Sequence, residues 1–371
     1  MKHFVQAVTL RWYNACAYYA VALTRGLMHH GYKVTFVGGY DTPAVKKARE
    51  LGCDVFDLPK LRYHGPFSFF TLADVYRKFA FENKVTLVNV HDGRDHLIWS
   101  VALRGTGIPL IRTSGNQIPP KNHTGARFLM KKTSGIIATC STIRNFYTES
   151  FGMRPEKIPV IHGGIDSDFY SIRHPRYLLR KKHCIPDNAF VFGIIARFSP
   201  DKGHTFFFRA AEIVAKKYPE AWFVVAGWNA QLKEADIRSM ASGVGILERT
   251  LFPGRYPDSR ELISLLDVGV IASVRSETVC RIAMEYMAMG IPVVATDTNV
   301  IPEIVRHGRS GFIVQAGNPE AMASAMVEMR ESKEKARTFG QNGRFIIESE
   351  YTLSSFASQT LRAYGSLTGD E

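Results

Sequence analysis

Two glutamates, Glu277 and Glu285, lie eight residues apart between two apolar runs of the sequence. The first run, 268–273, is typical of a buried strand, and a helix is predicted over 279–289. A carboxylate can accept hydrogen bonds from two neighbouring hydroxyls, such as those of a ribose or a sugar. The structural alternative is that Glu277 caps the helix and Glu285 faces solvent. However, Glu285 lies within AMEYMAMGIPVVAT, where an unpaired carboxylate is costly, so we expect it to have a partner.

Two cations, Arg197 and Lys202, follow another predicted strand, within GIIARFSPDKG (193–203). Arg supplies a fork of donors and Lys a point charge, and together they can bind a diphosphate and stabilise it as it departs. The helix after Glu277 begins at the carboxyl end of a strand, so its free N–H groups can also receive an anion. Glu303 is predicted to lie in the first turn of a further helix. A solvated loop for the two cations and a cap contact for Glu303 are the alternatives.

Short β-rich runs alternate along the chain with longer helical stretches, and these elements would position the candidate residues. The alternation predicts parallel sheets wound with helices. The predicted strands are 4–10, 33–39, 85–90, 108–113, 135–140 and 158–162, then 190–196, 222–227, 250–254, 268–273, 291–296 and 311–315. We therefore predict an α/β chain with two Rossmann-like domains. Ligands bind such sheets beyond the carboxyl ends of the strands, and each candidate residue follows a predicted strand.

The domain boundary is predicted in 170–188, a polar and basic segment interrupted by prolines. The predicted domains are residues 1–175 and 176–350. The tail from about 332 to 366 has a helical pattern. We expect its last part, 351–371, to cross back to the first domain.

The net charge of +13 over 371 residues implies an anionic partner: nucleic acid, a phospholipid surface or a phosphorylated substrate. The sequence shows no nucleic-acid-binding motif, so we do not expect nucleic acid as a partner. Five scattered cysteines without C-x-x-C spacing predict buried reduced thiols rather than disulfides or a zinc site. No apolar run is long enough to span a membrane, and Arg11 and Asn14 interrupt the first apolar segment, so we expect a cytoplasmic protein.

Taken together, these motifs resemble the family-4 (group 1) glycosyltransferases, which have the GT-B fold of two domains facing a cleft. Arg197 and Lys202 match the family's R-x4-K pair, and Glu277 and Glu285 match its E-x7-E signature. EYMAMGIPVVAT and IPEIVRHGRSGFIV match the runs that follow, and VIHGGIDSDF (160–169) is similar to the segment before the family's hinge. The resemblance is strong over about 190–330 and looser before it.

The resemblance implies a retaining transfer of a sugar from a nucleotide-diphosphate sugar, with no metal and no cofactor. Arg197 and Lys202 would bind the diphosphate, Glu277 would contact the sugar, and Glu285 would hold the ribose. The further donor-binding candidates are Val279, Cys280, Arg281, Gly227, Arg255 and Glu303.

Several positions depart from the family pattern. Thr278, Val279 and Cys280 stand where the family often has Gly-Phe-Gly after the first glutamate. Arg281 replaces an apolar residue, Asn299-Val300 replaces a common Gly-Gly, and Trp228-Asn229 interrupts a G-x-G. We therefore expect a donor pocket of unusual shape, and the donor sugar cannot be carried over from the family.

The first domain would bind the acceptor, and the candidates there are Asn14, His91 and Asp95. Each of these could equally be a structural loop residue. The basic and aromatic stretches 61–81 and 121–135 favour attachment to an anionic membrane surface. The alternative is that they are ordinary helices with basic outer faces.

The function predicted from the sequence is a retaining glycosyltransferase that acts on a glycan or lipid-linked acceptor, in bacterial cell-envelope polysaccharide or lipopolysaccharide biosynthesis. Two alternatives stay open: a nucleotide-sugar epimerase on the same fold, and a non-catalytic subunit that binds sugar nucleotides.

Overall fold

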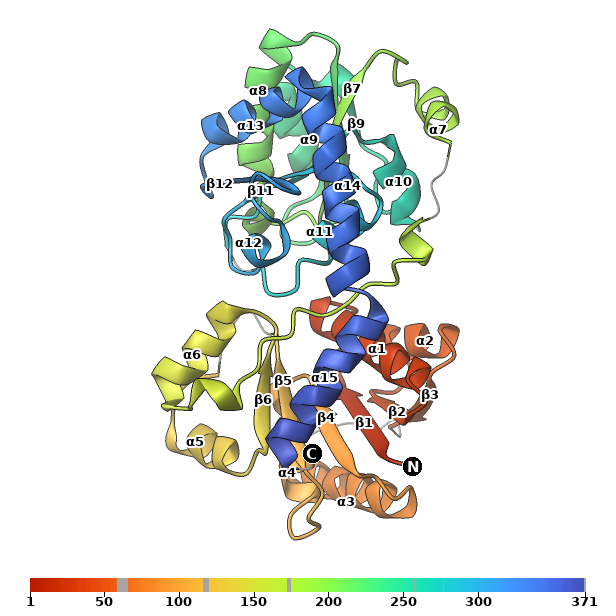
Figure 1. The fold of residues 1–371 in the computed structure, drawn as a ribbon, viewed down its shortest axis with the longest axis vertical. Helices are drawn as coiled ribbons and strands as arrows, with labels where there is room; N and C mark the ends of the chain where they lie inside the picture. The colour runs from red at the N-terminus through yellow and green to blue at the C-terminus, as the bar shows by residue number, and fades with distance from the viewer. Residues whose placement is uncertain (59–65, 116–119, 172–174, 257, 276, 370–371) are drawn as a thin grey trace. The chain divides into compact units, whose positions relative to one another are not determined.

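The computed structural model describes residues 1–58, 66–115, 120–171, 175–256, 258–275 and 277–369. These residues form two compact units, unit 1 of residues 1–164 with 351–371, and unit 2 of residues 165–350 (Figure 1). The boundary thus lies between Gly164 and Ile165, before the segment in which the sequence pattern placed it. The reason is local packing before the expected boundary: the Tyr170 hydroxyl donates to Glu285 Oε1 of unit 2 at 2.8 Å, and Phe169 O accepts from Arg260 of unit 2 at 3.1 Å.

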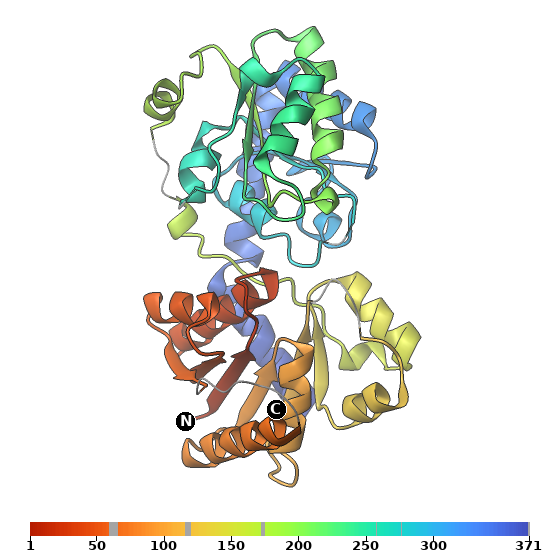
Figure 2. The same ribbon diagram turned by 180° about the vertical axis from the view of Figure 1, so that it is seen from behind.

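Unit 1 contains a six-stranded parallel sheet in the order β3-β2-β1-β4-β5-β6. Its strands are β1 His3–Val8, β2 Lys33–Gly38, β3 Asp54–Asp57, β4 Leu87–Val90, β5 Leu110–Ser114 and β6 Gly135–Ala138. Its helices are α1 Ala15–His29, α2 Pro43–Glu50, α3 Pro66–Glu82, α4 Gly93–Ala102, α5 Thr124–Lys131, α6 Ser141–Phe151 and α15 Leu353–Thr368, with the short helix η1 Pro155–Lys157. Helices α3 and α4 pack on one face of the sheet, and α1 and α2 on the other (Figure 2).

Unit 2 repeats this architecture in a second six-stranded parallel sheet, in the order β12-β11-β10-β7-β8-β9. Its strands are β7 Phe190–Ile195, β8 Ala221–Ala226, β9 Thr250–Leu251, β10 Val268–Ile271, β11 Val293–Thr296 and β12 Gly311–Val314. Its helices are α7 Arg176–Lys182, α8 His204–Lys217, α9 Glu234–Gly243, α10 Ser259–Leu265, α11 Arg281–Ala288, α12 Ile301–Ile304, α13 Pro319–Glu331 and α14 Lys333–Glu350, with the short helices η2 Phe169–Ser171, η3 Pro200–Lys202 and η4 Leu247–Arg249. The predicted α/β class with two Rossmann-like sheets is confirmed.

Both sheets reverse their winding direction at one point, between β1 and β4 in unit 1 and between β7 and β10 in unit 2. In doubly wound sheets the carboxyl edge at such a switch point is where ligands bind. The segments after β7 and β10 carry Arg197, Lys202 and Glu277, and those after β1 and β4 carry the acceptor candidates.

Two strand predictions differ from the structure. The run 158–162 is not a strand and contributes a single bridge, between Ala138 and Val160. Pro159 has no N–H to donate, which prevents a continuous ladder. Conversely, β3 consists of the short segment DVFD, which lacks the apolar run by which the other strands were recognised.

Helix α15 completes unit 1 from the far end of the chain. It packs against α1, where Phe356 contacts Tyr19 with ring centroids 4.6 Å apart. The Tyr364 hydroxyl accepts hydrogen bonds from Gln6 Nε2 at 3.0 Å and from Asn89 Nδ2 at 2.9 Å, so it joins α15 to β1 and β4. Among the residues that the structure describes, no helix is long and apolar enough to cross a membrane.

Candidate active site

The carboxyl edge of the unit 2 sheet brings together two of the predicted residues, Lys202 and Glu277. Lys202 ends η3, a short helix that follows β7, and Glu277 lies in the loop after β10. Lys202 Nζ forms an ion pair with Glu277 Oε1, and the two side chains are 17% and 10% exposed. The Ser273 hydroxyl donates to the same carboxylate oxygen at 2.7 Å. The arrangement therefore places a cation and an oriented carboxylate beside the switch point of the sheet.

Asn299 holds the backbone of the Glu277 loop. Its Oδ1 accepts a hydrogen bond of 3.1 Å from Glu277 N, and Val300 N donates to Glu277 O at 3.1 Å. Asn299 has φ of +45°, in the left-handed region that glycine adopts freely and asparagine tolerates better than most residues. Asparagine can thus replace the family's glycine here and add a side-chain contact that glycine lacks.

Val279 and Cys280 lead into α11 at its N-terminal end. Both are buried, and Cys280 is the N-cap residue, with φ of +43°. Burial raises the pKa of the Cys280 thiol, so this residue stays a neutral thiol. The helix begins at Arg281, and its first N–H groups have no intrahelical acceptor, as at any helix start.

Glu285 lies on α11 and is only 1% exposed. Its Oε1 accepts from Arg281 Nε at 2.7 Å and from the Tyr170 hydroxyl at 2.8 Å. These two residues are the partners that the apolar surroundings of Glu285 require. Its other oxygen, Oε2, is buried and has no hydrogen-bond partner among the described residues.

The other donor candidates lie around the same edge of the sheet. Arg197, two residues after β7, is partly exposed and forms no hydrogen bond or ion pair with any residue in the described part of the chain. Arg255 is exposed, with its guanidinium 5.8 Å from the centroid of the Trp228 ring. Glu303 lies in the first turn of α12, as predicted. Gly227 follows β8, where an added Cβ would lie 2.0 Å from Ala196 O, so strand packing alone requires a glycine there.

Two acceptor candidates of unit 1, His91 and Asp95, are buried, which favours the structural role that was their alternative. They are 1% and 0% exposed. His91 Nε2 hydrogen-bonds Gln6 Oε1 at 2.9 Å, and burial lowers the pKa of His91 to about 3. Asp95 accepts from Thr9 N at 2.8 Å and from Thr9 Oγ1 at 2.9 Å, and burial followed by the charge of Asp92 raises its pKa. Both residues fasten elements of unit 1 together.

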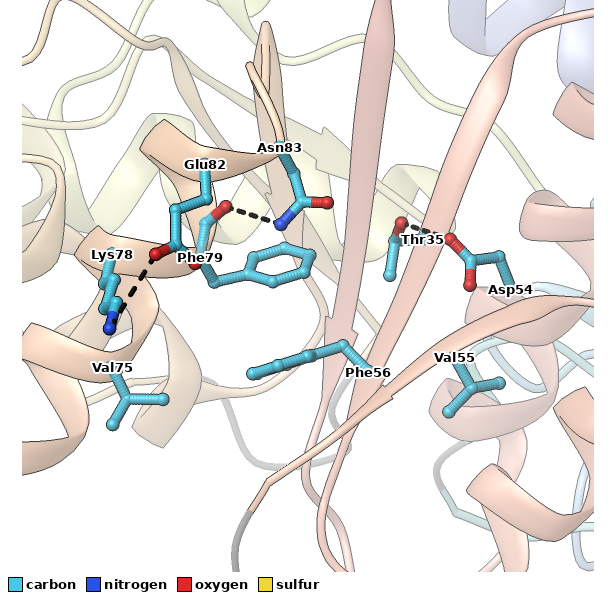
Figure 3. Close-up of a pocket in the computed structure, with 9 residues that line it drawn as sticks. All are labelled: Thr35, Asp54, Val55, Phe56, Val75, Lys78, Phe79, Glu82 and Asn83. Carbon is cyan, nitrogen blue, oxygen red and sulfur yellow. Dashed lines mark hydrogen bonds and ion pairs between the residues drawn. The ribbon is translucent and has the colours of Figure 1, made fainter.

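Asn14 is exposed beyond β1, and its Oδ1 caps α1 by accepting from Ala17 N at 3.0 Å. Contact of Asn14 with an acceptor stays a prediction. A cavity of about 340 Å³ in unit 1 lies at the other edge of this sheet, where Thr35 lies in the first half of β2, Asp54 begins β3 and Phe79 lies in the last turn of α3 (Figure 3). The cavity is therefore separate from the loops that carry the candidates.

Sequence reasoning assigned no role to three residues of the site: Tyr170, Ser273 and Asn299. Asn299 was noted only as a departure from the family pattern, although an asparagine in place of glycine is a sign of left-handed backbone. Tyr170 carried no signal, because it lies 115 residues from Glu285 in the sequence. Ser276, part of the same polar turn, lies outside the described residues.

Comparison with known proteins agrees with the fold. Residues 176–345 match the family described as "Glycosyl transferases group 1", and residues 17–169 match "Glycosyltransferase Family 4". The chain belongs to the group 1 glycosyltransferases.

The relatives are distant. A putative glycosyltransferase of Bacillus subtilis, EpsD, is 31% identical over 196 residues, which are 52% of this chain and 50% of that protein. This chain therefore spans half the length of that relative. An Escherichia coli enzyme described as UDP-Gal:alpha-D-GlcNAc-diphosphoundecaprenol alpha-1,3-galactosyltransferase is 21% identical over 270 residues, 68% of each chain. The structure of Anabaena Alr3699/HepE in complex with UDP and glucose has a TM-score of 0.82 at 19% identity, over 98% of this chain and 99% of that chain, and shows the same GT-B fold.

Proposed function

We propose that this chain is a retaining glycosyltransferase that uses a nucleotide-diphosphate sugar as donor. The observation that carries the proposal is the Lys202–Glu277 pair at the switch point of the unit 2 sheet. A cation for the leaving diphosphate and a carboxylate for sugar hydroxyls are what such a transfer needs at one place. The HepE structure, which has the same fold, was solved with UDP and glucose, and this supports the class of donor.

In the proposed reaction, Lys202 and Arg197 stabilise the negative charge that develops on the departing diphosphate. The Lys202 ammonium has three N–H donors, of which Glu277 occupies one, so the others can reach phosphate oxygens. Glu277 is fixed through Ser273 and Asn299 and accepts hydroxyls of the transferred sugar. The acceptor oxygen bonds to the anomeric carbon on the face that the phosphate oxygen leaves, and that phosphate oxygen takes the acceptor's proton. Since the two cations offset the negative charge of the diphosphate, we propose that no metal and no cofactor is required.

The test is a transfer assay of the purified chain with UDP-, GDP-, ADP- and CMP-sugars, with and without EDTA. We expect hydrolysis or transfer with one donor class and a loss of about 100-fold or more in Lys202→Ala, comparable to losing one charge-stabilising donor. Lys216→Ala, which removes a lysine that is 74% exposed and paired with Glu212, is the matched control and should keep full activity. Near-normal turnover in Lys202→Ala would contradict the site assignment, and loss of activity in EDTA would contradict metal independence.

The same assay separates the alternatives. An epimerase would convert the donor sugar without any acceptor, and a non-catalytic subunit would bind a nucleotide sugar, as a thermal shift shows, without consuming it.

We further propose that the acceptor is a glycan or lipid-linked molecule of the bacterial cell envelope, and that the protein binds reversibly to the cytoplasmic membrane surface. Phe81 and Phe128 are 55% and 63% exposed, and Arg77 and Lys132 lie over their rings. Basic and aromatic side chains in this combination suit an anionic bilayer interface. Flotation with anionic liposomes at physiological salt checks this, and a protein that stays entirely in the unbound fraction would rule it out.

A further inference from the structure

The two carboxylate oxygens of Glu285 have different surroundings. Oε1 receives two donors, Arg281 Nε at 2.7 Å and the Tyr170 hydroxyl at 2.8 Å. Oε2 is buried and receives none from the described residues. A buried acceptor without a donor is costly, so the site lacks one hydrogen-bond donor that a ligand can supply.

Arg281 and Tyr170 reach Oε1 from two different elements. Arg281 precedes Glu285 by one helical turn on α11, the spacing that brings two side chains together on a helix face. Tyr170 comes from η2, which packs against α11. The η2 segment is itself fixed, because the Arg260 guanidinium lies 3.6 Å from the centroid of the Phe169 ring and donates to Phe169 O at 3.1 Å.

The missing donor has a defined chemistry. An ionised carboxylate accepts hydrogen bonds and repels phosphate, so the group that meets Oε2 is a hydroxyl or an N–H. The hydroxyls of a nucleotide ribose are such donors, and acidic side chains near the strand ends of Rossmann-type sheets bind them.

We propose that Arg281 and Tyr170 are positioning residues of the donor site: by occupying Oε1, they leave Oε2 as the one oxygen of Glu285 that receives a ribose hydroxyl. This inference rests on the proposed function, because it takes a nucleotide as the ligand. Its consequence is recognition of one of the two ribose hydroxyls rather than of the pair.

The experiment measures the affinity of the full chain, by calorimetry, for UDP, GDP and ADP and for the 2′-deoxy and 3′-deoxy forms of whichever binds. In the wild type we expect one deoxy form to bind about tenfold or more weakly, the factor for a hydrogen bond to a charged group, and the other to bind nearly as well as the parent. In Tyr170→Phe and in Arg281→Met, we expect the difference in affinity between the parent nucleotide and the more weakly bound deoxy form to fall to about twofold or less. The affinity for that deoxy form itself should change little. In the transfer assay KM for the donor should rise while kcat changes little.

Two matched variants control for damage to the fold. Tyr218→Phe removes a tyrosine hydroxyl that donates to Glu331 at 2.5 Å, and Arg238→Met removes an arginine that contacts Glu234, four residues earlier on α9, with Nε 2.9 Å from Oε1. Both should keep the wild-type preference between the nucleotides.

The outcomes separate the inference from the function on which it rests. If the wild type bound no nucleotide, the proposed function would fail with it. If nucleotides bound but both deoxy forms were equally weak, or if both variants kept the wild-type preference, the positioning role would be wrong.

Discussion

Asn299 shows how a single residue can replace a glycine and change the role of its position. The left-handed backbone is kept, and the side chain adds a hydrogen bond to the loop that carries Glu277. The family's glycine would provide the same turn without the contact. The departure from the family pattern at this position is, in the structure, a different way of fixing the carboxylate.

We predict that Asn299→Gly keeps the fold but lowers kcat, because the backbone still fits while Glu277 N loses its acceptor. A hydrogen bond worth about 1 kcal/mol corresponds to a loss of about fivefold. Asn299→Ala should lower the free energy of unfolding as well, by about 1–2 kcal/mol, because alanine is strained in the left-handed backbone conformation. Steady-state kinetics and thermal unfolding of both variants check this. Equal kcat in Asn299→Gly and wild type would show that the contact is dispensable.

At the scale of elements, the positions of the residues that follow β7 and β8 depend on close contact between these two strands. Gly227 follows β8 at a point where Ala196 O, just beyond β7, leaves no space for a side chain. Arg197 is the next residue after Ala196, so the position of this cation depends on the same contact. The predicted donor role of Gly227 stays open, and the packing role is independent of it.

We therefore predict that Gly227→Ala destabilises the protein by about 1–3 kcal/mol, the usual cost of overpacking. Gly243→Ala is the matched control: Gly243 ends α9 and an added Cβ has no neighbour within 4 Å. Its replacement should be neutral or stabilise by up to about 1 kcal/mol, because alanine is the better helix former. Urea unfolding of the two variants checks the prediction, and equal midpoints would refute it.

Most of the strands could be predicted from the sequence because parallel strands covered on both faces are continuous apolar runs. Short or charged segments such as β3 lack this signal. Lys202 and Glu277 could be placed at the carboxyl edge of the sheet because they follow such apolar runs in the sequence. For His91 and Asp95 the sequence left a binding role and a structural role open, because a polar residue after a strand can bond outward or inward. That choice depends on partners such as Gln6 and Thr9, which lie far away in the sequence.

For the molecule as a whole, buried histidines set the response to acid. Burial lowers the pKa of His91 and His96 to about 3 and that of His204 to about 4, well below the ordinary value of 6.5. Each is neutral in the folded state and takes up a proton more readily when unfolded. The stability they contribute is therefore complete above about pH 6.5 and is lost as the pH falls toward the folded values. The raised pKa of Asp95 acts in the opposite direction.

We predict that the free energy of unfolding falls between pH 6.5 and 4.5, by up to about 1.4 kcal/mol per pH unit for each buried histidine. His96→Gln removes one of these groups, and glutamine can keep the hydrogen bond to Thr133 Oγ1, which is 2.7 Å from His96 Nε2 in the structure. Its unfolding free energy should therefore fall less steeply with acid than that of the wild type. Denaturant titrations at three pH values give the change in unfolding free energy with pH for both proteins. Equal changes in the wild type and in His96→Gln would show that His96 does not contribute to the loss of stability in acid.

The discontinuity of unit 1 has a consequence for synthesis. A ribosome makes residues 1–164 first, yet helix α15, whose Tyr364 accepts hydrogen bonds from Gln6 and Asn89, is made only after residue 350. Unit 2 is contiguous in the chain, so it can become complete before the unit that precedes it. During translation, the surface of the first unit that α15 later covers therefore stays exposed to solvent until α15 has been made. Any chaperone that recognises this surface can bind it in that interval.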